Sequence, residues 1–256
     1  MVAIKNLYNI KLLLIILSST ALLAFSTSQD KKITVYMIGD STMANKKEPE
    51  INPEFGWGQV FSTYFNNQVS VENKAVNGRS SRSFIAEGRW DSIYKYIQPG
   101  DYVFVQFGHN DQKEKDPKRF TNPFTQYRYN LERFVKDTRE KGGIPILLSS
   151  IVRRNFNEYG VLIDTHGSYP LVARMVAKDL KVPFIDLQGL TENMEIEYGV
   201  EGSKVLHLHF KPGEHTYYPN GKEDDTHLSK QGATEVADLV VSALKKQVPD
   251  LAVYLK

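Results

Sequence analysis

The chain has 256 residues, of which 41% are hydrophobic and none is cysteine. This length and composition allow one full hydrophobic core, and they exclude a disulfide or a lipid-modified cysteine. Lysine and arginine number 32 against 30 aspartates and glutamates, so the charge balance offers no general argument for nucleic acid or an anionic membrane as a partner.

The N-terminal stretch has the organisation of a secretory signal peptide. Lys5 and Lys11 precede the apolar run 12–25, and small and polar residues follow it. The run is shorter than the ~20 apolar residues of a membrane-spanning helix, although an uncleaved anchor is the alternative. We therefore expect residues 1–26 to be a cleaved signal peptide, and residues 30–256 to be a single, nearly neutral domain that is secreted or periplasmic and needs no membrane.

The β-branched and apolar run 33–38 predicts a buried strand that stops at Gly39-Asp40-Ser41. Ser41 would lie just past the carboxyl end of this strand, where open α/β sheets hold their ligands. A serine there can attack a carbonyl carbon while nearby backbone N–H groups stabilise the negative charge on the carbonyl oxygen. The plainer interpretation is that Asp40 and Ser41 cap a helix.

A second strand is predicted over residues 69–76, and it ends in Asn77-Gly78. Glycine lets a backbone N–H approach a ligand closely, so Gly78 is a candidate donor to an oxyanion. An Asn-Gly pair is also an ordinary turn signal. Between the two strands, residues 56–66 predict a helix whose Trp57 either packs in the core or stacks on a sugar ring.

Residues 101–107 form the clearest buried strand, and Gly108-His109-Asn110-Asp111 follow directly. The amide of Asn110 is a neutral donor that would complete an oxyanion hole with the backbone N–H groups of Ser41 and Gly78. The alternative is a turn residue that hydrogen-bonds within its own loop.

Strands and helices alternate along most of the chain. Such alternation predicts a parallel sheet that is covered by helices on both faces. The remaining predicted helices cover residues 83–97, 124–141, 169–180 and 190–199, and the remaining strands cover residues 144–151 and 182–187.

Three histidines near the C-terminal end raise the question of a metal site. His207 and His209 alternate within a strand-like segment, and His215 follows. No carboxylate stands at a familiar ligand spacing, and alternating histidines also occur on solvated strand faces. The histidine pattern by itself therefore does not favour a metal site.

The segment 221–227 is expected to be a turn in which an acid precedes a histidine by three residues. Asp224 at this spacing can bind Nδ1 of His227 and leave the other ring nitrogen free, as a serine nucleophile requires. Asp225 is the alternative acid. Ser229 is a candidate N-cap for a helix that begins beside His227, and the helix dipole and Asp224 would act on this imidazole in opposite directions.

These segments together resemble the SGNH (GDSL-type) hydrolases, which carry four sequence blocks in this order. The similarity extends over nearly the whole mature chain, and the stretches 55–59, 77–90 and 224–229 resemble the rhamnogalacturonan acetylesterase branch. The blocks are Gly39-Asp40-Ser41, Gly78, Gly108-His109-Asn110-Asp111 and Asp224-x-x-His227.

The resemblance implies a three-layer α/β/α sandwich of the flavodoxin-like kind, with a five-stranded parallel sheet and no cofactor. It implies Ser41 as nucleophile, His227 as base and Asp224 as its partner. The donors of the oxyanion hole would be Ser41, Gly78 and Asn110. Asp225 departs from the branch, which usually has asparagine there.

Four arginines lie near these blocks and are candidates for binding an acidic substrate. Planar guanidinium groups suit the carboxylates of a pectin backbone. The alternative is that they form internal salt bridges, for instance with Glu87 or Asp111. The four are Arg79, Arg82, Arg153 and Arg154.

The sequence thus predicts a secreted serine esterase that removes acetyl groups from pectin through an acetyl-enzyme. One alternative is a deacetylase of xylan or another neutral glycan. The other is a non-catalytic carbohydrate-binding protein on a degenerate hydrolase scaffold. The expected partner is an acetylated acidic polysaccharide or oligosaccharide.

Overall fold

The structure is a computed structural model that describes residues 32–256. The expected signal peptide, residues 1–26, lies outside the described residues. Residues 33–256 form one compact unit. None of the helices in the described part of the chain has the length and apolar character needed to cross a membrane.

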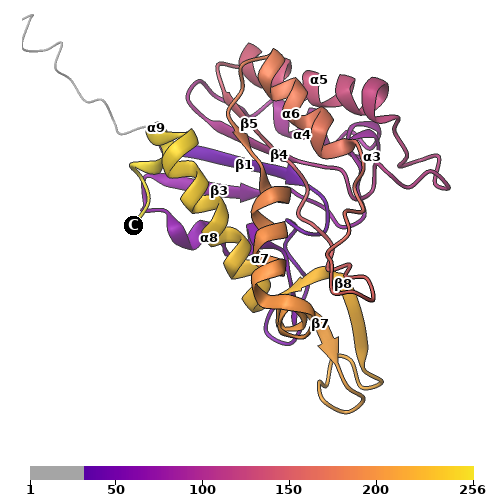
Figure 1. The fold of residues 1–256 in the computed structure, drawn as a ribbon. Helices are drawn as coiled ribbons and strands as arrows, with labels where there is room; N and C mark the ends of the chain where they lie inside the picture. The colour runs from indigo at the N-terminus through magenta and orange to yellow at the C-terminus, as the bar shows by residue number, and fades with distance from the viewer. Residues whose placement is uncertain (1–31) are drawn as a thin grey trace, which may run out of the picture. The chain divides into compact units, whose positions relative to one another are not determined.

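A five-stranded parallel sheet forms the centre of this unit (Figure 1). Its strand order, β3-β1-β4-β5-β6, reverses direction beside β1, and ligands of open α/β sheets bind at such a reversal. The strands are β1 (Ile33–Gly39), β3 (Val69–Asn73), β4 (Tyr102–Gln106), β5 (Ile144–Leu148) and β6 (Phe184–Ile185).

Side chains alternate between the two faces along each strand, so both faces of this sheet are apolar. Helices cover both of them. Val35 and Met37 of β1 belong to one buried cluster, whereas Tyr36 and Ile38 belong to another. The first cluster includes α2 (Trp57–Phe61), α7 (Leu187–Gly202) and α8 (Lys230–Gln247), and the second includes α3 (Ser81–Ala86), α4 (Arg89–Tyr94), α5 (Arg128–Glu140) and α6 (Tyr169–Asp179). The predicted three-layer α/β/α sandwich is confirmed.

Several predicted elements differ in length from the observed ones. The helix predicted over 83–97 is two helices, α3 and α4, because Gly88 adopts a left-handed conformation with φ 67°. Short elements extend others: η1 (Ser62–Tyr64) follows α2, η2 (Pro123–Tyr127) precedes α5, η3 (Ser203–Leu206) follows α7, and α9 (Pro249–Ala252) follows α8.

A small antiparallel sheet was not predicted. It consists of β2 (Glu54–Phe55), β8 (Lys222–Ser229) and β7 (His207–Phe210), in the order β2-β8-β7. The expectation of a turn over 221–227 was therefore wrong, since most of that segment is β8. The pairing of β7 with β8 shifts register between His207 and Leu208. Opposite this shift, the side chain of Asp224 accepts hydrogen bonds from the backbone N–H groups of Thr226 and His227.

Candidate active site

Ser41 lies in a tight turn directly after β1. The side chain of Asp40 shapes this turn, because its Oδ1 accepts hydrogen bonds from the backbone N–H of Thr42 at 3.0 Å and from its hydroxyl at 2.9 Å. The next helix, α2, begins only at Trp57. The interpretation of Asp40 and Ser41 as a helix cap is therefore wrong.

The hydroxyl of Ser41 and the ring of His227 lie within hydrogen-bonding distance, although 186 positions separate them. Nε2 of His227 is 3.0 Å from Oγ of Ser41. On the other side of the ring, Nδ1 is 2.9 Å from Oδ2 of Asp224. Because a carboxylate only accepts, Nδ1 carries the proton and Nε2 presents a lone pair to the serine hydroxyl.

Asp224 also binds the backbone beside His227. Its Oδ1 accepts from the N–H of His227 at 2.9 Å and from the N–H of Thr226 at 3.0 Å. Burial alone would raise the pKa of Asp224, but the hydrogen bonds from the side chain and backbone of His227 outweigh it and hold the pKa well below its ordinary value. Asp224 is therefore a stable anion beside the imidazole.

Asp225 has different partners. Its Oδ1 is 2.9 Å from Nη1 of Arg154 and 2.8 Å from Nε2 of His209. Regular strand alternation would place Asp225 on the same face as His227. The register irregularity and the hydrogen bonds from the backbone N–H groups of Thr226 and His227 instead bring the carboxylate of Asp224 to the ring. The geometry selects Asp224.

The three predicted oxyanion donors follow the neighbouring strands β1, β3 and β4 at the carboxyl edge of the sheet. The N–H groups of Ser41 and Gly78 donate no hydrogen bond within residues 32–256, and Gly78 has φ 74°. The amide of Asn110 is oriented by two contacts: Nδ2 donates to the carbonyl of Arg79 at 3.1 Å, and Oδ1 accepts from Nη1 of Arg119 at 3.2 Å. The second N–H of Asn110 stays available.

The four candidate arginines have different surroundings. Arg79 is paired with Glu87 at 3.1 Å, as the alternative interpretation expects. Arg82 is exposed, and within residues 32–256 its one hydrogen bond is a 3.4 Å contact with the carbonyl of Phe120. Arg153 donates to the hydroxyl of Thr165 at 2.8 Å and has no carboxylate within 4.0 Å in the described chain.

Arg154 does not face a substrate. It is buried, and its guanidinium donates to Asp225, to Ser203 at 3.0 Å and to the carbonyl of Val200. Each of its three nitrogens donates to a protein acceptor and the side chain is 9% exposed, so the geometry does not favour the expectation that Arg154 binds substrate. Its ion pair with Asp225 links it to β8, the strand that carries His227.

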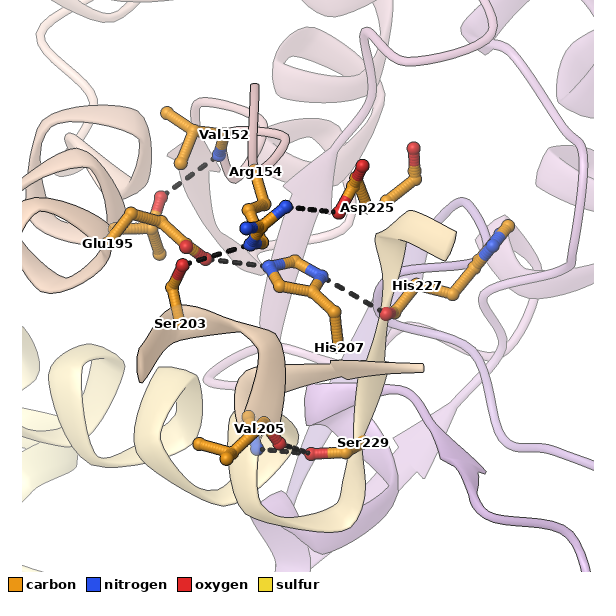
Figure 2. Close-up of polar contacts among 12 residues, drawn as sticks. Val152, Arg154, Glu195, Ser203, Val205, His207, Asp225, His227 and Ser229 are labelled. Carbon is orange, nitrogen blue, oxygen red and sulfur yellow. Dashed lines mark hydrogen bonds and ion pairs between the residues drawn. The ribbon is translucent and has the colours of Figure 1, made fainter. Parts of the chain in front are cut away.

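The backbone of His227 contacts a buried pair of side chains, Glu195 and His207, whose pairing the sequence analysis missed (Figure 2). Nδ1 of His207 lies 3.2 Å from the carbonyl oxygen of His227, and Nε2 lies 2.7 Å from Oε1 of Glu195. Both side chains are at most 2% exposed. Figure 2 shows the ring of His227 extending away from His207, so this pair contacts the main chain and leaves the ring free.

The three histidines considered for a metal have separate partners. His207 binds Glu195, His209 binds Asp225, and His215 packs against Phe210 with ring centroids 5.0 Å apart. Among residues 32–256, no three side chains of the metal-binding types lie together in a suitable group.

Polar residues of the third block are buried beneath the site. Nδ1 of His109 is 3.1 Å from Nε2 of His166, and burial lowers the pKa of both rings. Burial raises the pKa of Asp111 to about 7, although it accepts hydrogen bonds from Ser81 and Thr121. Trp57 is fully buried and donates to Gln106 at 2.6 Å, so it packs in the core and does not stack on a sugar.

Lys46 was also missed. Its ammonium group is buried and donates a hydrogen bond to the carbonyl oxygen of Ser41. Lys46 stands beside Lys47 in a polar loop, and nothing in the pattern distinguishes a buried lysine from an exposed one there.

Comparison with known proteins agrees with this geometry. Residues 37–234 match the GDSL-like lipase/acylhydrolase family. The chain is 44% identical over 216 residues to rhamnogalacturonan acetylesterase RhgT of Bacillus subtilis, covering 84% of this chain and 91% of the relative.

Two solved structures are also similar. The structure of the YxiM protein of Bacillus subtilis has a TM-score of 0.70 and 28% identity, over 84% of this chain and 57% of that one. The structure of Axe2, an acetyl-xylooligosaccharide esterase from Geobacillus, has a TM-score of 0.60 over 84% of this chain and 96% of that one; at 19% identity it shows the shared fold only. The family match and the 44% identity place the chain in the GDSL-like lipase/acylhydrolase family, a family of serine esterases.

Proposed function

We propose that this protein is a secreted esterase that removes acetyl groups from the rhamnogalacturonan of pectin, with Ser41, His227 and Asp224 as its catalytic residues. The observation that carries the proposal is the continuous series of contacts from Asp224 through His227 to Ser41, at 2.9 and 3.0 Å. These are the distances at which a base can take the proton of a serine hydroxyl.

In the first half of the reaction, Oγ of Ser41 bonds to the acetyl carbon while Nε2 of His227 takes the hydroxyl proton. The electron pair of the carbonyl bond moves to its oxygen, which becomes an oxyanion. When the tetrahedral intermediate collapses, the sugar oxygen leaves with the proton from Nε2, and the acetyl group stays on Ser41.

In the second half, a water molecule gives a proton to Nε2 and attacks the acetyl carbon. Collapse of this second intermediate releases acetic acid and returns the proton to Oγ of Ser41. Asp224 stays ionised throughout and stabilises the imidazolium that forms in each half. The N–H groups of Ser41, Gly78 and Asn110 would bind the oxyanion in both halves.

The substrate assignment is supported by the 44% identity to RhgT and by two arginines without carboxylate partners in the described chain, Arg82 and Arg153. A guanidinium that has no internal anion is available for a galacturonate carboxylate. Arg79 is less suitable because its Nε is already bound to Glu87, a carboxylate that it shares with Arg89.

The first experiment measures hydrolysis of 4-nitrophenyl acetate by purified protein. Activity that is lost in both Ser41→Ala and His227→Ala supports the proposal. Turnover that persists in both variants contradicts it. Binding of oligosaccharides without any ester turnover would favour the carbohydrate-binding alternative.

The second experiment compares acetate release from acetylated rhamnogalacturonan and acetylated xylan. We expect Arg153→Gln and Arg82→Gln to lower kcat/KM on rhamnogalacturonan and to leave 4-nitrophenyl acetate hydrolysis unchanged. Arg139→Gln is the matched control, because Arg139 lies in α5 and donates to the carbonyl of Lys181. Equal activity of the wild type on xylan would support the neutral-glycan alternative.

A further inference from the structure

The ammonium group of Lys46 is buried beneath the nucleophile turn, and all three of its donor directions are used. The side chain is 1% exposed and forms an ion pair with Oε1 of Glu54 at 2.7 Å. Nζ also donates to Oδ1 of Asn77 at 3.0 Å and to the carbonyl oxygen of Ser41. A lysine ammonium has three N–H donors and no acceptor, so the group is fully coordinated by the protein.

Each of these acceptors belongs to a segment that carries a different part of the site. Ser41 is the nucleophile, and Asn77 directly precedes Gly78 of the oxyanion hole. Glu54 lies in β2, which pairs with β8 so that Glu54 faces Ser229, two residues beyond His227. The side chain of Lys46 therefore contacts three segments: the turn at Ser41, the turn at Asn77 and Gly78, and β2. Strand β2 in turn pairs with β8, which carries His227.

Burying a charged ammonium group requires its desolvation, so the arrangement is better explained by a functional role than by a gain in stability. Burial lowers the pKa of Lys46, and the charge of Glu54 acts against this effect. Buried ion pairs recover little net stability after desolvation, whereas a fully satisfied polar network can restrict the backbone to one geometry. The contact with the Ser41 carbonyl restrains the residue whose hydroxyl attacks and whose N–H binds the oxyanion.

We propose that Lys46 is a positioning residue for the esterase reaction: it sets the Ser41 turn and the Gly78 turn at the separation that the tetrahedral intermediate requires. The proposal rests on the function proposed above. Because its ammonium contacts a carbonyl and not the reacting atoms, Lys46 acts on the rate through the placement of Ser41 and Gly78.

The test compares Lys46→Met with Lys47→Met, its exposed sequence neighbour. Methionine keeps the length and apolar body of the side chain and removes the three donors. We expect kcat for 4-nitrophenyl acetate to fall ~10²-fold in Lys46→Met, the size of effect that a misplacement of about 1 Å produces. KM should stay within about twofold, because substrate contacts are unchanged, and Lys47→Met should match the wild type.

A second variant, Asn77→Ala, removes one acceptor of the ammonium group at an exposed position, where loss of folding is not expected. We expect a smaller fall in kcat, roughly tenfold, again with little change in KM. Thermal denaturation of each variant reports whether the fold is retained.

The outcomes separate this inference from the proposed function. A wild type that does not hydrolyse the ester refutes the function itself. An active wild type together with a folded Lys46→Met that matches Lys47→Met refutes the role of Lys46. If Lys46→Met does not fold, Asn77→Ala decides: a reduced kcat at unchanged KM supports the role, and an unchanged kcat refutes it.

Discussion

Asp224 binds His227 twice, through its ring and through its backbone. One carboxylate oxygen lies 2.9 Å from Nδ1, and the other accepts from the backbone N–H of His227 at 2.9 Å. Two contacts to one residue restrict both the position and the rotation of the imidazole. Since Nδ1 donates to Asp224, the tautomer that leaves Nε2 free for Ser41 is the favoured one.

This geometry predicts opposite results for two neighbouring acids. Asp224→Asn should lower kcat by ~10²- to 10⁴-fold, because an amide can donate to Nδ1 and favour the wrong tautomer. Asp225→Asn should keep kcat within a few-fold and lower the melting temperature, because it weakens the contact with Arg154. Kinetics on 4-nitrophenyl acetate and thermal denaturation measure both effects. A larger loss of kcat in Asp225→Asn would reassign the acid.

The proposed role of Asn110 as an oxyanion donor predicts a loss in the chemical step. Asn110→Ala should lower kcat by ~10²- to 10³-fold with little change in KM, because the donor acts on charge that develops only in the transition state. Asn122→Ala is a suitable control, since Asn122 caps η2 and its side chain contacts the N–H of Phe124. A fall of less than threefold in Asn110→Ala would argue against the assignment.

The buried pair Glu195 and His207 predicts a graded effect on kcat. His207→Leu removes the donor to the carbonyl of His227 and should lower kcat by about tenfold, because the main chain that carries the base is less restrained. His207→Asn places an amide donor near the position of Nδ1 and should recover much of that loss. Equal kcat in the two variants would show that the contact does not matter for catalysis.

The raised pKa of Asp111 predicts that its contribution to protein stability depends on pH. Burial raises its pKa from 3.8 to about 7, so between these pH values the folded protein binds more protons at this carboxyl than the unfolded chain does. The contribution of Asp111 to the free energy of unfolding therefore falls as pH rises through this window. Asp111→Asn lacks this titration, and its deficit in melting temperature should shrink from pH 5 to pH 8. A deficit that widens with pH would contradict the raised pKa.

The main sheet was predictable because local periodicity reflects burial. The runs that became β1, β4 and β5 are predominantly apolar, as is typical of parallel strands covered on both faces. The small sheet was missed because its strands lack this apolar periodicity. β8 is a polar segment with mixed burial, and only its pairing with β2 and β7 makes it a strand.

Which of two adjacent residues of the same type is buried depends on contacts with residues far away in the sequence. Arg153 and Arg154 are adjacent and identical in type, yet only Arg154 meets Asp225, 71 positions away. Lys46 and Lys47 differ in the same way, since only Lys46 is enclosed by Ser41, Asn77 and Glu54. No local pattern contains this information.

The amino-acid sequence by itself determined the order of the main-sheet strands, the four blocks with their serine, glycine, asparagine and histidine, and the family to which they belong. These features depend on residue type and local spacing, which burial and backbone conformation control directly. The tertiary structure alone decided that Asp224 and not Asp225 faces His227, that Arg154 is internal, and that Lys46 lies beneath Ser41. Those outcomes depend on hydrogen bonds and ion pairs between residues that become neighbours only when the chain folds.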